Sequence, residues 1–541
     1  MRHTESVAKT RFALGLLVLL FPMFFALGRG FHVRPNGSSS GDGSASRPWD
    51  LRTAFNKTGV ILPGDTVWLH GGVYRGTFES SLVGTASSPV VVRSYPGEWA
   101  VIDNNGTNDN ALWLKGAYTW FWGFEVMNSN PNPPRGEAGV NFAASTSNKL
   151  INVIIHDEGA TGINPYWAAI NSEVYGCLVY YNGRMDDPEH ANGYGIYGQN
   201  IAPGRKYVQD NFFFNMFGIF PAHMAGSSNA RLDDISFIGN TFFGHTLYDG
   251  KNVIALYGNF ETGSGRNLNP EWRSNFFYRA DFWLGYNGDG VENAVYTDNY
   301  FFRGGAVEHP ANTYAAKSGN VFTSSGNQVF VRANRYADRY EPRRASIIVF
   351  NGSGASSVSV TLPAGVLNVG DKYQVRDVQN YFGTPITSGN YTGGAITIPM
   401  PGSGSPIAAP RSIPANRPGR SLPQHTSNEF GAFVLLANAV GTWPNDVVEL
   451  PGVATSYALE QNYPNPFNPT TRIEFAIPEA SHVNLTVYNM LGQEVKTLVD
   501  ENLPAGLHRA TFDAAGLPTG VYVYTITAGE YVSSRKMVLL K

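Results

Sequence analysis

The stretch DNFFFNMFGI, residues 210–219, places three consecutive phenylalanines directly after an asparagine, where a strand with one solvated face would alternate apolar and polar residues. The same pattern, Asn or Gly followed by mostly apolar residues, recurs as GFEV at Gly123, NVII at Asn152, GCLV at Gly176, NFFF at Asn211, NTFF at Asn240, NFFY at Asn275, NYFF at Asn299 and NVFT at Asn320. Successive copies start 29, 24, 35, 29, 35, 24 and 21 residues apart. A period in the twenties, with longer copies that carry insertions, predicts a solenoid in which stacked coils bury a continuous core.

Alternation along each copy predicts which side chains face that core. With the Asn or Gly as position zero, positions +1 and +3 are expected to point inward and positions +2 and +4 outward. The inward set is Val153, Ile155, Cys177, Val179, Phe212, Phe214, Phe276 and Tyr278. The outward set is Leu178, Phe213, Phe242, Phe277 and Phe301 at +2, and His156, Tyr180, Asn215, Gly244, Arg279 and Arg303 at +4. Two roles are open for the column at +2, a surface covered by a loop or by the following domain, or a platform for sugar rings.

The asparagines of the repeat have a structural role of their own. If they stack at one turn of the solenoid, their side chains can pass hydrogen bonds from coil to coil. Such a ladder would satisfy amide groups that would otherwise be buried without partners.

The N-terminus predicts export. Three basic residues, Arg2, Lys9 and Arg11, precede an apolar run over residues 12–27, which is typical of a secretory signal peptide over residues 1–30; a membrane anchor is the alternative. Cys177 is the single cysteine among 541 residues, so neither an internal disulfide nor a cysteine metal site is expected. The net charge is −3 without a basic block, so we expect no nucleic-acid partner.

The rest of the chain divides by composition and pattern. Residues 31–327 are expected to form the solenoid, with a short helix near residues 51–56 as its N-terminal cap. Alternating segments such as SIIVFN and SVSVTLP predict a small antiparallel β-sandwich over residues 328–440. A linker over residues 441–456 leads to a last sandwich, residues 457–541.

That last segment contains the most specific motifs of the chain. NYPNPFNPTT, VYNMLGQEV, LPTGVYVY and RKMVLL follow one another in order. They strongly resemble the Ig-like C-terminal sorting domain of the type IX secretion system of the Bacteroidota and their relatives. The resemblance implies contact with that secretion machinery, passage across an outer membrane, and release or attachment at the cell surface.

The first 330 residues resemble right-handed parallel β-helix proteins, through the segment PGDTVWLHGGVYRG and the repeats that follow it. This superfamily includes pectate lyases, alginate and chondroitin lyases, and polygalacturonase-like hydrolases. The resemblance implies a right-handed parallel β-helix, which together with the two predicted β-sandwiches makes the chain all-β. The WIDH and RxPxxR motifs of pectate lyases are absent, and so is the hydrolase set of NTD, DD, GHG and RIK, so no catalytic residue can be carried over by position.

Candidate chemistry concentrates in the longest insertion of the solenoid, NGRMDDPEHANGYGIYGQN at residues 182–200. Its polar and aromatic residues of interest are Asp186, Asp187, Glu189, His190, Tyr197 and Gln199. Carboxylates at this density can bind a hard cation such as Ca²⁺ or act as acid and base; a solvated loop is the alternative.

Corresponding strands of other coils add a polar and aromatic wall: His156, Asp157, Glu158, His223, Tyr257, Tyr286, Asp289, Glu308 and His309. A long surface of this kind suits a polymer with many hydroxyl groups. Together with the insertion, these residues predict a site for an extracellular polysaccharide.

Three functions remain open at this level. A polysaccharide lyase would use His190 or Tyr197 as base, Arg279 or Lys251 to neutralise the uronate carboxylate, and Ca²⁺ held by the acids of residues 186–189. A glycoside hydrolase would use two acids from among Asp186, Asp187, Glu189 and Glu158. A glycan-binding or adhesive surface protein would use the aromatic column alone. We favour a secreted, monomeric lyase that acts on a uronate-containing glycan.

Overall fold

The computed structural model describes residues 28–105, 107–134, 138–183, 193–201, 204–226, 231–244, 252–259, 267–286, 290–333, 340, 344–410, 424–437, 448–450, 457–459, 461–462, 465–479, 481–503 and 506–540. Most of the predicted signal peptide therefore lies outside the described residues. Within them, no helix is long and apolar enough to cross a bilayer.

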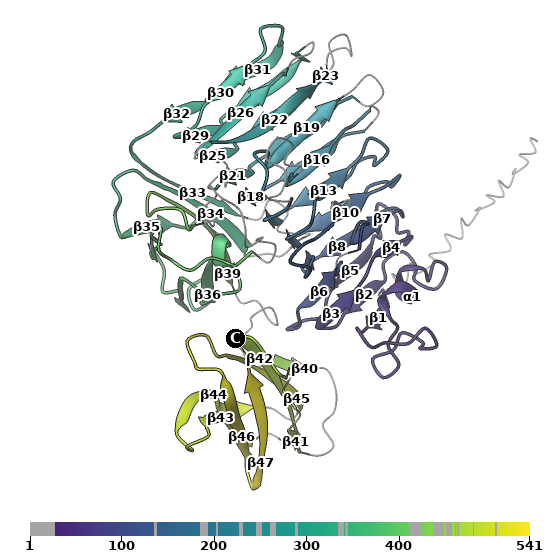
Figure 1. Ribbon diagram of the computed structural model, residues 1–541, viewed down its shortest axis with the longest axis vertical. Helices are drawn as coiled ribbons and strands as arrows, with labels where there is room; N and C mark the ends of the chain where they lie inside the picture. The colour runs from purple at the N-terminus through teal and green to yellow at the C-terminus, as the bar shows by residue number, and fades with distance from the viewer. Residues whose placement is uncertain are drawn as a thin grey trace, which may run out of the picture.

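Three long parallel sheets stack coil upon coil along the first part of the chain (Figure 1). Sheet 1 contains β1 (Gly30–Val33), β2 (Thr66–Leu69), β5 (Val90–Ser94), β8 (Thr119–Trp122), β11 (Lys149–Ile151), β14 (Glu173–Tyr175), β17 (Lys206–Gln209), β20 (Ile235–Ile238), β24 (Glu271–Arg273), β28 (Ala294–Thr297) and β31 (Tyr314–Ser318). Sheet 2 contains β3 (Gly72–Arg75), β6 (Ala100–Asp103), β9 (Glu125–Met127), β12 (Ile154–His156), β15 (Leu178–Tyr180), β18 (Phe212–Phe214), β21 (Thr241–Phe243), β25 (Phe276–Tyr278), β29 (Tyr300–Phe302) and β32 (Val321–Thr323). Sheet 3 contains β4 (Phe78–Ser80), β7 (Leu112–Leu114), β10 (Ala138–Phe142), β13 (Thr161–Pro165), β16 (Ile196–Gly198), β19 (Ala222–Gly226), β22 (Val253–Asn259), β26 (Ala280–Leu284) and β30 (Ala306–Glu308). The predicted all-β class and parallel β-helix are confirmed.

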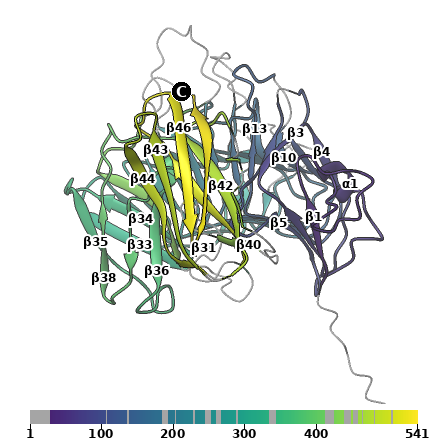
Figure 2. The same cartoon turned by 90° about the horizontal axis from the view of Figure 1, so that it is seen from below.

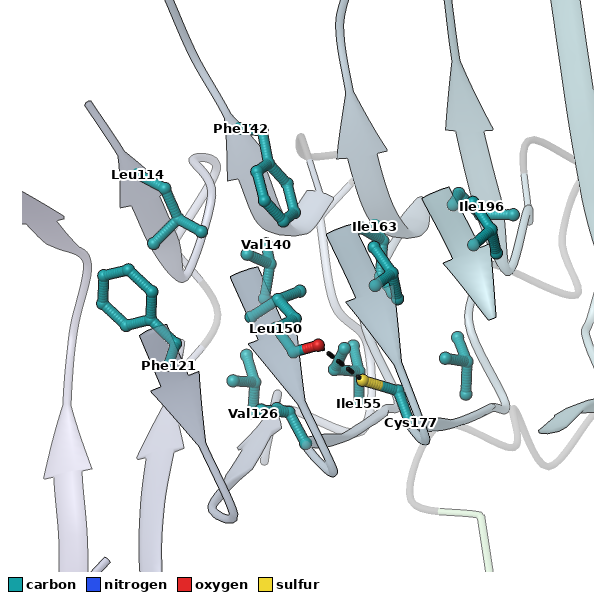
Figure 3. Packing of buried hydrophobic residues seen from close by; sticks show 14 of the residues in the cluster. Leu114, Phe121, Val126, Val140, Phe142, Leu150, Ile155, Ile163, Cys177 and Ile196 are labelled. Carbon is teal, nitrogen blue, oxygen red and sulfur yellow. Dashed lines mark hydrogen bonds between the residues drawn. The ribbon is translucent and has the colours of Figure 1, made fainter. Parts of the chain in front are cut away.

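Each coil passes through sheets 1, 2 and 3 in that order, so the three sheets enclose one core. Figure 3 shows this core, with Val126, Ile155 and Cys177 pointing toward Leu150, Ile163 and their neighbours. At the N-terminal end, α1 (Leu51–Phe55) covers the first coil with Leu51, Ala54 and Phe55 buried. Its first turn is capped by Asp50, whose carboxylate accepts from the Thr53 backbone N–H at 2.8 Å. A short two-stranded sheet, β23 (Asn267–Leu268) with β27 (Val291–Glu292), extends two later coils.

The turn between sheets 1 and 2 explains why Asn and Gly recur. One residue of each turn has a left-handed conformation, with positive φ at Gly123, Asn152, Gly176, Asp210, Gly239, Ser274, Asp298 and Gly319. Glycine tolerates that conformation best, followed by residues with a short polar side chain such as Asn and Asp. In the later coils the residue after this position is an asparagine, and the predicted ladder is present: Asn211 Nδ2 donates to Asn240 Oδ1 at 2.9 Å, and Asn240 Nδ2 donates to Asn275 Oδ1 at 3.1 Å.

The Asn or Gly that begins each repeat therefore lies at one turn position in the early coils and at the next turn position in the later coils. The predicted inward and outward faces of the later coils are reversed as a result. Val179 pairs with Phe213, so Asn211 lies one residue after the position equivalent to Gly176. The inward assignments of Val153, Ile155, Cys177 and Val179 are confirmed by their place in the core. The assignments from Asn211 onward are wrong: Phe213, Phe242, Phe277 and Phe301 are fully buried in the core, whereas Phe212, Phe214, Phe276 and Tyr278 face outward with Leu178.

A second domain covers this outward face of sheet 2. Its main sheet has the order β33 (Asn327–Ala333), β34 (Arg344–Asn351), β39 (Phe430–Ala437), β36 (Lys372–Asp377) and β37 (Thr387–Asn390), all antiparallel. The short pair β35 (Ser357–Thr361) and β38 (Ala395–Pro399) and the turn η1 (Val378–Asn380) complete it. Phe430 stacks on Tyr278 with ring centroids 4.4 Å apart, and Phe350 lies 5.2 Å from Phe302. The outward stripe is thus an interface with the following domain, which is one of the two roles expected for it. Of the residues predicted at +2, Leu178 belongs to this interface, whereas the four phenylalanines do not.

The last domain has two four-stranded sheets around a core of its own. One contains β40 (Val448–Leu450), β41 (Ala458–Leu459), β42 (Thr470–Ile477) and β45 (Gly506–Asp513), and the other β43 (Ser481–Asn489), β44 (Glu494–Leu503), β46 (Gly520–Ala528) and β47 (Tyr531–Leu539). Figure 2 shows its strands in front, with the second domain to the left and the first coils to the right.

Candidate functional site

The outer face of sheet 3 carries one continuous row of side chains, which we call the outer row. Along β10, Val140 and Phe142 enter the core, so Asn141 between them faces outward. The same alternation and the strand register place these residues side by side: Trp113, Asn141, Asn164, Tyr197, His223, Leu256 and Trp283. Among the described residues, the hydrophobic cluster that joins sheet 2 to the second domain contains no member of this row.

Two residues in the middle of the outer row, Tyr197 and His223, form an aromatic cluster with Tyr194 and Phe220 from outside the row. We call these four residues the His223 cluster. The His223 ring is 4.4 Å from the Tyr194 ring and 5.6 Å from the Tyr197 ring, in both cases edge to face. It also stacks on Phe220 at 4.8 Å. His223 is 5% exposed, while the three aromatic residues are half-buried. The cluster therefore offers aromatic surface to a ligand above a nearly buried imidazole.

Burial sets the protonation state of this cluster. Desolvation lowers the pKa of His223 to about 4, so its imidazole is neutral at neutral pH. The pKa of Tyr197 is raised by burial, and that of Tyr194 is raised by burial and by the neighbouring Tyr197, so both phenols keep their protons. A neutral imidazole beside two protonated phenols is a proton acceptor next to two proton donors.

Amide side chains hold the phenols of the outer face in place. Gln199 Nε2 donates to Tyr197 Oη at 3.3 Å and to the carbonyl of Ala225 at 3.1 Å. On the preceding coil, Asn164 Nδ2 donates to Tyr166 Oη at 3.3 Å. The Tyr166 and Tyr197 rings lie edge to face at 6.3 Å. The structure thus brings together three of the predicted site residues, Tyr197, Gln199 and His223.

The segment predicted to supply acids begins and ends beside this cluster. A Cβ added to Gly193 would lie 2.8 Å from both Gly183 Cα and the backbone N of Gly218, so the two ends of the segment are close to the chain that leads to Phe220. Asp186, Asp187, Glu189 and His190 lie outside the described residues, as do Lys251 and Asp289. In the part of the chain that the structure describes, no group of three or more His, Cys, Asp or Glu side chains is arranged to hold a metal ion.

His156 and Tyr180, predicted to contact substrate, lie on sheet 2 instead. Their rings stack at 4.8 Å, and Tyr180 packs in the interface with the second domain. Both ring nitrogens of His156 are hydrogen-bonded to carboxylates, Nδ1 to Asp157 Oδ2 at 2.6 Å and Nε2 to Glu125 Oε1 at 2.9 Å. Although burial opposes the charge, these two carboxylates raise its pKa to about 9. The structure therefore separates both residues from the His223 cluster.

The remaining predicted contacts are also placed elsewhere. Asn215, Arg279 and Arg303 occupy left-handed turn positions after sheet 2. Arg303 bonds Glu429 of the second domain, with Arg279 at 4.0 Å from the same carboxylate. Tyr257 is fully buried in the core, because its neighbours in the register, Met224 and Leu284, point inward.

The proposed wall is likewise divided. Glu308 forms an ion pair with Lys317 at 2.7 Å and accepts a hydrogen bond from Tyr314. It lies with His309 near the last coil, far along the solenoid from His223. Tyr286 stacks on Trp283 of the outer row at 5.5 Å. Glu158 is 1% exposed, and burial raises the pKa of its carboxyl to about 8, while Asn104 donates to it at 3.3 Å.

Several residues of the site are not evident from pattern alone. Tyr166, Tyr194 and Phe220 read as ordinary apolar positions of their coils. Lys206 is 1% exposed, and its ammonium donates to the carbonyls of Tyr166 and Gln199, each at 2.7 Å, and to Asn200 Oδ1 at 3.1 Å. Burial lowers its pKa to about 7. Lys206 thereby connects the chain after β13, at Tyr166, to the chain after β16, at Gln199. The one feature of the sequence that points to this role is a lysine at the start of a core strand.

Comparisons with known proteins agree with this fold. Residues 31–209 match the family model described as Pel9A-like, right handed beta helix region, and residues 461–540 match the secretion system C-terminal sorting domain. Pectate lyase L of Thermoclostridium stercorarium is 31% identical over 142 residues, which is 25% of this chain and 11% of that protein. Pectate lyase PEL9 of Emericella nidulans is 27% identical over 237 residues, or 39% of this chain and 54% of that protein. The chain thus spans about a tenth and about half of the lengths of these two relatives.

Solved structures are more distant. The crystal structure of pectate lyase Pel9A is 18% identical and covers 55% of this chain and 81% of its own, with a TM-score of 0.34. The catalytic domain of a GH87 alpha-1,3-glucanase in complex with nigerose is 12% identical and covers 50% of this chain and 66% of its own, with a TM-score of 0.20. The sorting domain indicates export to the cell surface or the medium. The chain therefore combines a segment that matches a Pel9A-like right-handed beta helix region, residues 31–209, with a segment that matches a secretion system C-terminal sorting domain, residues 461–540.

Proposed function

We propose that the protein is a secreted polysaccharide lyase that cleaves a uronate-containing glycan on the outer face of sheet 3. The observation that carries the proposal is the His223 cluster, where an imidazole kept neutral by burial lies against two phenols that keep their protons. The match of residues 31–209 to a Pel9A-like β-helix, and two relatives named pectate lyases, support the substrate class.

The reaction would be a β-elimination. The neutral imidazole of His223 accepts the proton from C5 of the uronate, the electron pair forms the C4–C5 double bond, and the C4–O4 bond breaks. The phenol of Tyr197, oriented by Gln199, donates its proton to the leaving O4. Solvent then returns one proton to the phenolate and removes one from the imidazolium, so that the site is restored.

The developing charge on the uronate carboxylate must be balanced by a cation or a guanidinium. The predicted calcium ligands Asp186, Asp187 and Glu189 are the candidates for this part of the site, since Arg279 and Arg303 are oriented toward Glu429. Bound calcium would supply positive charge at the carboxylate.

The test uses the purified full chain against polygalacturonate, alginate, and neutral galactan and glucan, with added calcium and with a chelator. New reducing ends measure cleavage, and ultraviolet absorbance of unsaturated uronate measures elimination. We expect both signals on a uronate polymer and neither on the neutral glycans. Reducing ends without the absorbance would identify a hydrolase and contradict the proposal. No cleavage of any polymer under either condition would also reject it.

Binding without catalysis is the second candidate, favoured by the half-buried aromatic rings Trp113, Trp283 and Tyr286 on either side of the cluster. It predicts retention of the full chain on an immobilised glycan with no product formed.

A further inference from the structure

We infer that the protein has a second saccharide site, a pocket between the first coils of the β-helix and the second domain that binds a short oligosaccharide bearing carboxylates. The pocket has a volume of about 470 Å³. Volumes of roughly 300–1,000 Å³ are typical of small-molecule sites. The saccharide class rests on the proposed function, whereas the location and charge of the pocket do not.

The pocket arises because the second domain covers only part of sheet 2. From Ile154 to Phe302, the outer face of sheet 2 is buried against that domain. On the earlier coils, Val73, Val101 and Glu125 continue the same row but line the pocket instead. The second domain forms the opposite wall with Arg376, Tyr381 and Phe382, and the sorting domain also lines the pocket, through Asn468, Thr470 and Thr511. The β-helix side of the pocket therefore includes sheet 2 and the turn at residues 95–99, away from the outer row of sheet 3.

Aromatic rings from both sides of the pocket meet at one contact. The ring of Trp99 in the β-helix lies edge to face with that of Phe382 in the second domain, at 5.5 Å, and Phe382 in turn contacts Tyr381 at 5.5 Å. Trp99 Nε1 donates to Glu125 Oε2 at 2.8 Å, which fixes the indole. Phe382 is 41% exposed. An exposed ring beside a fixed indole presents apolar surface of the kind that packs against sugar rings.

The charges of the pocket favour an anion. Its lining contains four guanidiniums, from Arg75, Arg93, Arg344 and Arg376, and three carboxylates, from Glu98, Asp103 and Glu125. All three carboxylates already have donors: Glu98 has His70 and the Gly71 N–H, Asp103 has Arg75, and Glu125 has Trp99 and His156.

Arg75 is the guanidinium best placed to receive a ligand. It uses Nη1 for Asp103 at 2.6 Å, and its side chain is 58% exposed, so further N–H donors remain for a ligand carboxylate. Guanidiniums recognise planar carboxylates through paired hydrogen bonds, which an ammonium cannot reproduce. Carboxylate recognition next to stacking surface points to a uronate oligosaccharide, held by a site distinct from the His223 cluster.

The experiment is isothermal titration calorimetry of the full chain carrying His223→Gln, which prevents turnover, with trigalacturonate and with galactotriose as the neutral match. Phe382→Ala is expected to weaken trigalacturonate binding about 3- to 10-fold through lost stacking. Arg75→Lys keeps the positive charge beside Asp103. It is expected to weaken trigalacturonate binding about 10-fold, because an ammonium cannot form the paired hydrogen bonds of a guanidinium. The matched controls are Phe322→Ala, with a ring 51% exposed on the last coil, and Arg47→Lys, which forms an exposed pair with Asp42; neither is expected to change the affinity.

Unchanged affinity in both Phe382→Ala and Arg75→Lys would overturn the inference, as would equal affinity for galactotriose or no binding of either sugar. Failure of the proposed function would look different. In that case the otherwise unmodified chain would not cleave any uronate polymer, yet the two pocket variants would still lose affinity for trigalacturonate. If cleavage depends on His223 but neither pocket variant changes the affinity for trigalacturonate, only this inference is rejected and the proposed function stands.

Discussion

His223 is the residue on which the proposed chemistry depends, because it is the nearly buried base among phenols in the outer row. We expect His223→Gln and Tyr197→Phe each to lower kcat on a uronate polymer by about 10²- to 10⁴-fold, the usual contribution of a general base or acid. Initial rates of absorbance increase measure the effect. His482→Gln, with a side chain 59% exposed in the sorting domain, and Tyr207→Phe, with a residue 37% exposed on sheet 1, are the matched controls. A rate unchanged in His223→Gln would remove this residue from the mechanism.

The same histidine sets the expected acid limb of the pH profile. Its pKa is lowered to about 4 by burial, so the base stays neutral well below pH 6.5, the ordinary value for a histidine. We therefore expect kcat/KM to fall only as the pH approaches about 4.

Stability should follow the same pKa. Between pH 4 and 6.5 the imidazole is protonated in the unfolded chain but neutral in the folded one. The free energy of unfolding therefore decreases as the pH falls from about 6.5 toward 4, and His223 does not change it above pH 6.5. Urea unfolding of the parent and of His223→Gln across that range checks this, and equal pH dependence in the two proteins would contradict it.

At the level of elements, the asparagine ladder holds the later coils in register. Asn240 donates to Asn275 Oδ1 and to the Val208 carbonyl, and its own oxygen accepts from Asn211. Asn240→Ala would leave buried partners unsatisfied, a cost of about 1–3 kcal/mol. We expect the thermal midpoint of the β-helix to fall measurably, while Asn56→Ala, at an exposed helix end, should leave it nearly unchanged. Equal midpoints for the two variants would show that the ladder adds no net stability.

The register of these elements also marks the limit of what pattern can predict. Spacing between repeats is sufficient for a stacked parallel solenoid, because coils of similar length must align. It does not distinguish the left-handed turn residue from the asparagine after it, since both positions accept Asn, and a shift of one residue reverses every face. The pairs Asp210–Asn211 and Gly239–Asn240 contain the missing signal, a turn residue directly before the ladder residue.

The candidate site has the same limit. Tyr197 and His223 come together because they occupy equivalent positions on neighbouring strands of one sheet, and Gln199 follows Tyr197 by two residues on the same side. His156 and Tyr180 lie on another sheet, away from these residues. Their position could not be predicted, because the repeat pattern shows neither which sheet a segment joins nor which face the next domain covers.

For the molecule as a whole, the question is what holds the second domain on sheet 2. The contacts include the aromatic stripe around Phe430, the ion pair of Arg303 with Glu429, and the ion pair of Arg332 with Asp210 at 2.8 Å, whose side chains are 19% and 6% exposed. The Arg303 side chain is 42% exposed, and pairs of that kind contribute about 0–1 kcal/mol. Phe430 is fully buried between the two domains, and its truncation would cost about 3–5 kcal/mol. By these magnitudes, aromatic burial at Phe430 contributes more to the docking than the Arg303–Glu429 pair does.

This assignment predicts unequal effects of two variants at one interface. Phe430→Ala should lower the thermal midpoint and admit protease to the segments joining the two domains, because it opens a cavity against Tyr278 and Phe243. Arg303→Gln should change neither by more than a small amount, and raising the salt concentration should leave the parent protein's domain contact intact. Phe322→Ala, at the exposed end of the solenoid, controls for loss of an aromatic ring as such. Should Arg303→Gln release the domain while Phe430→Ala does not, the contact would be ionic, and the aromatic stripe would be only its lining.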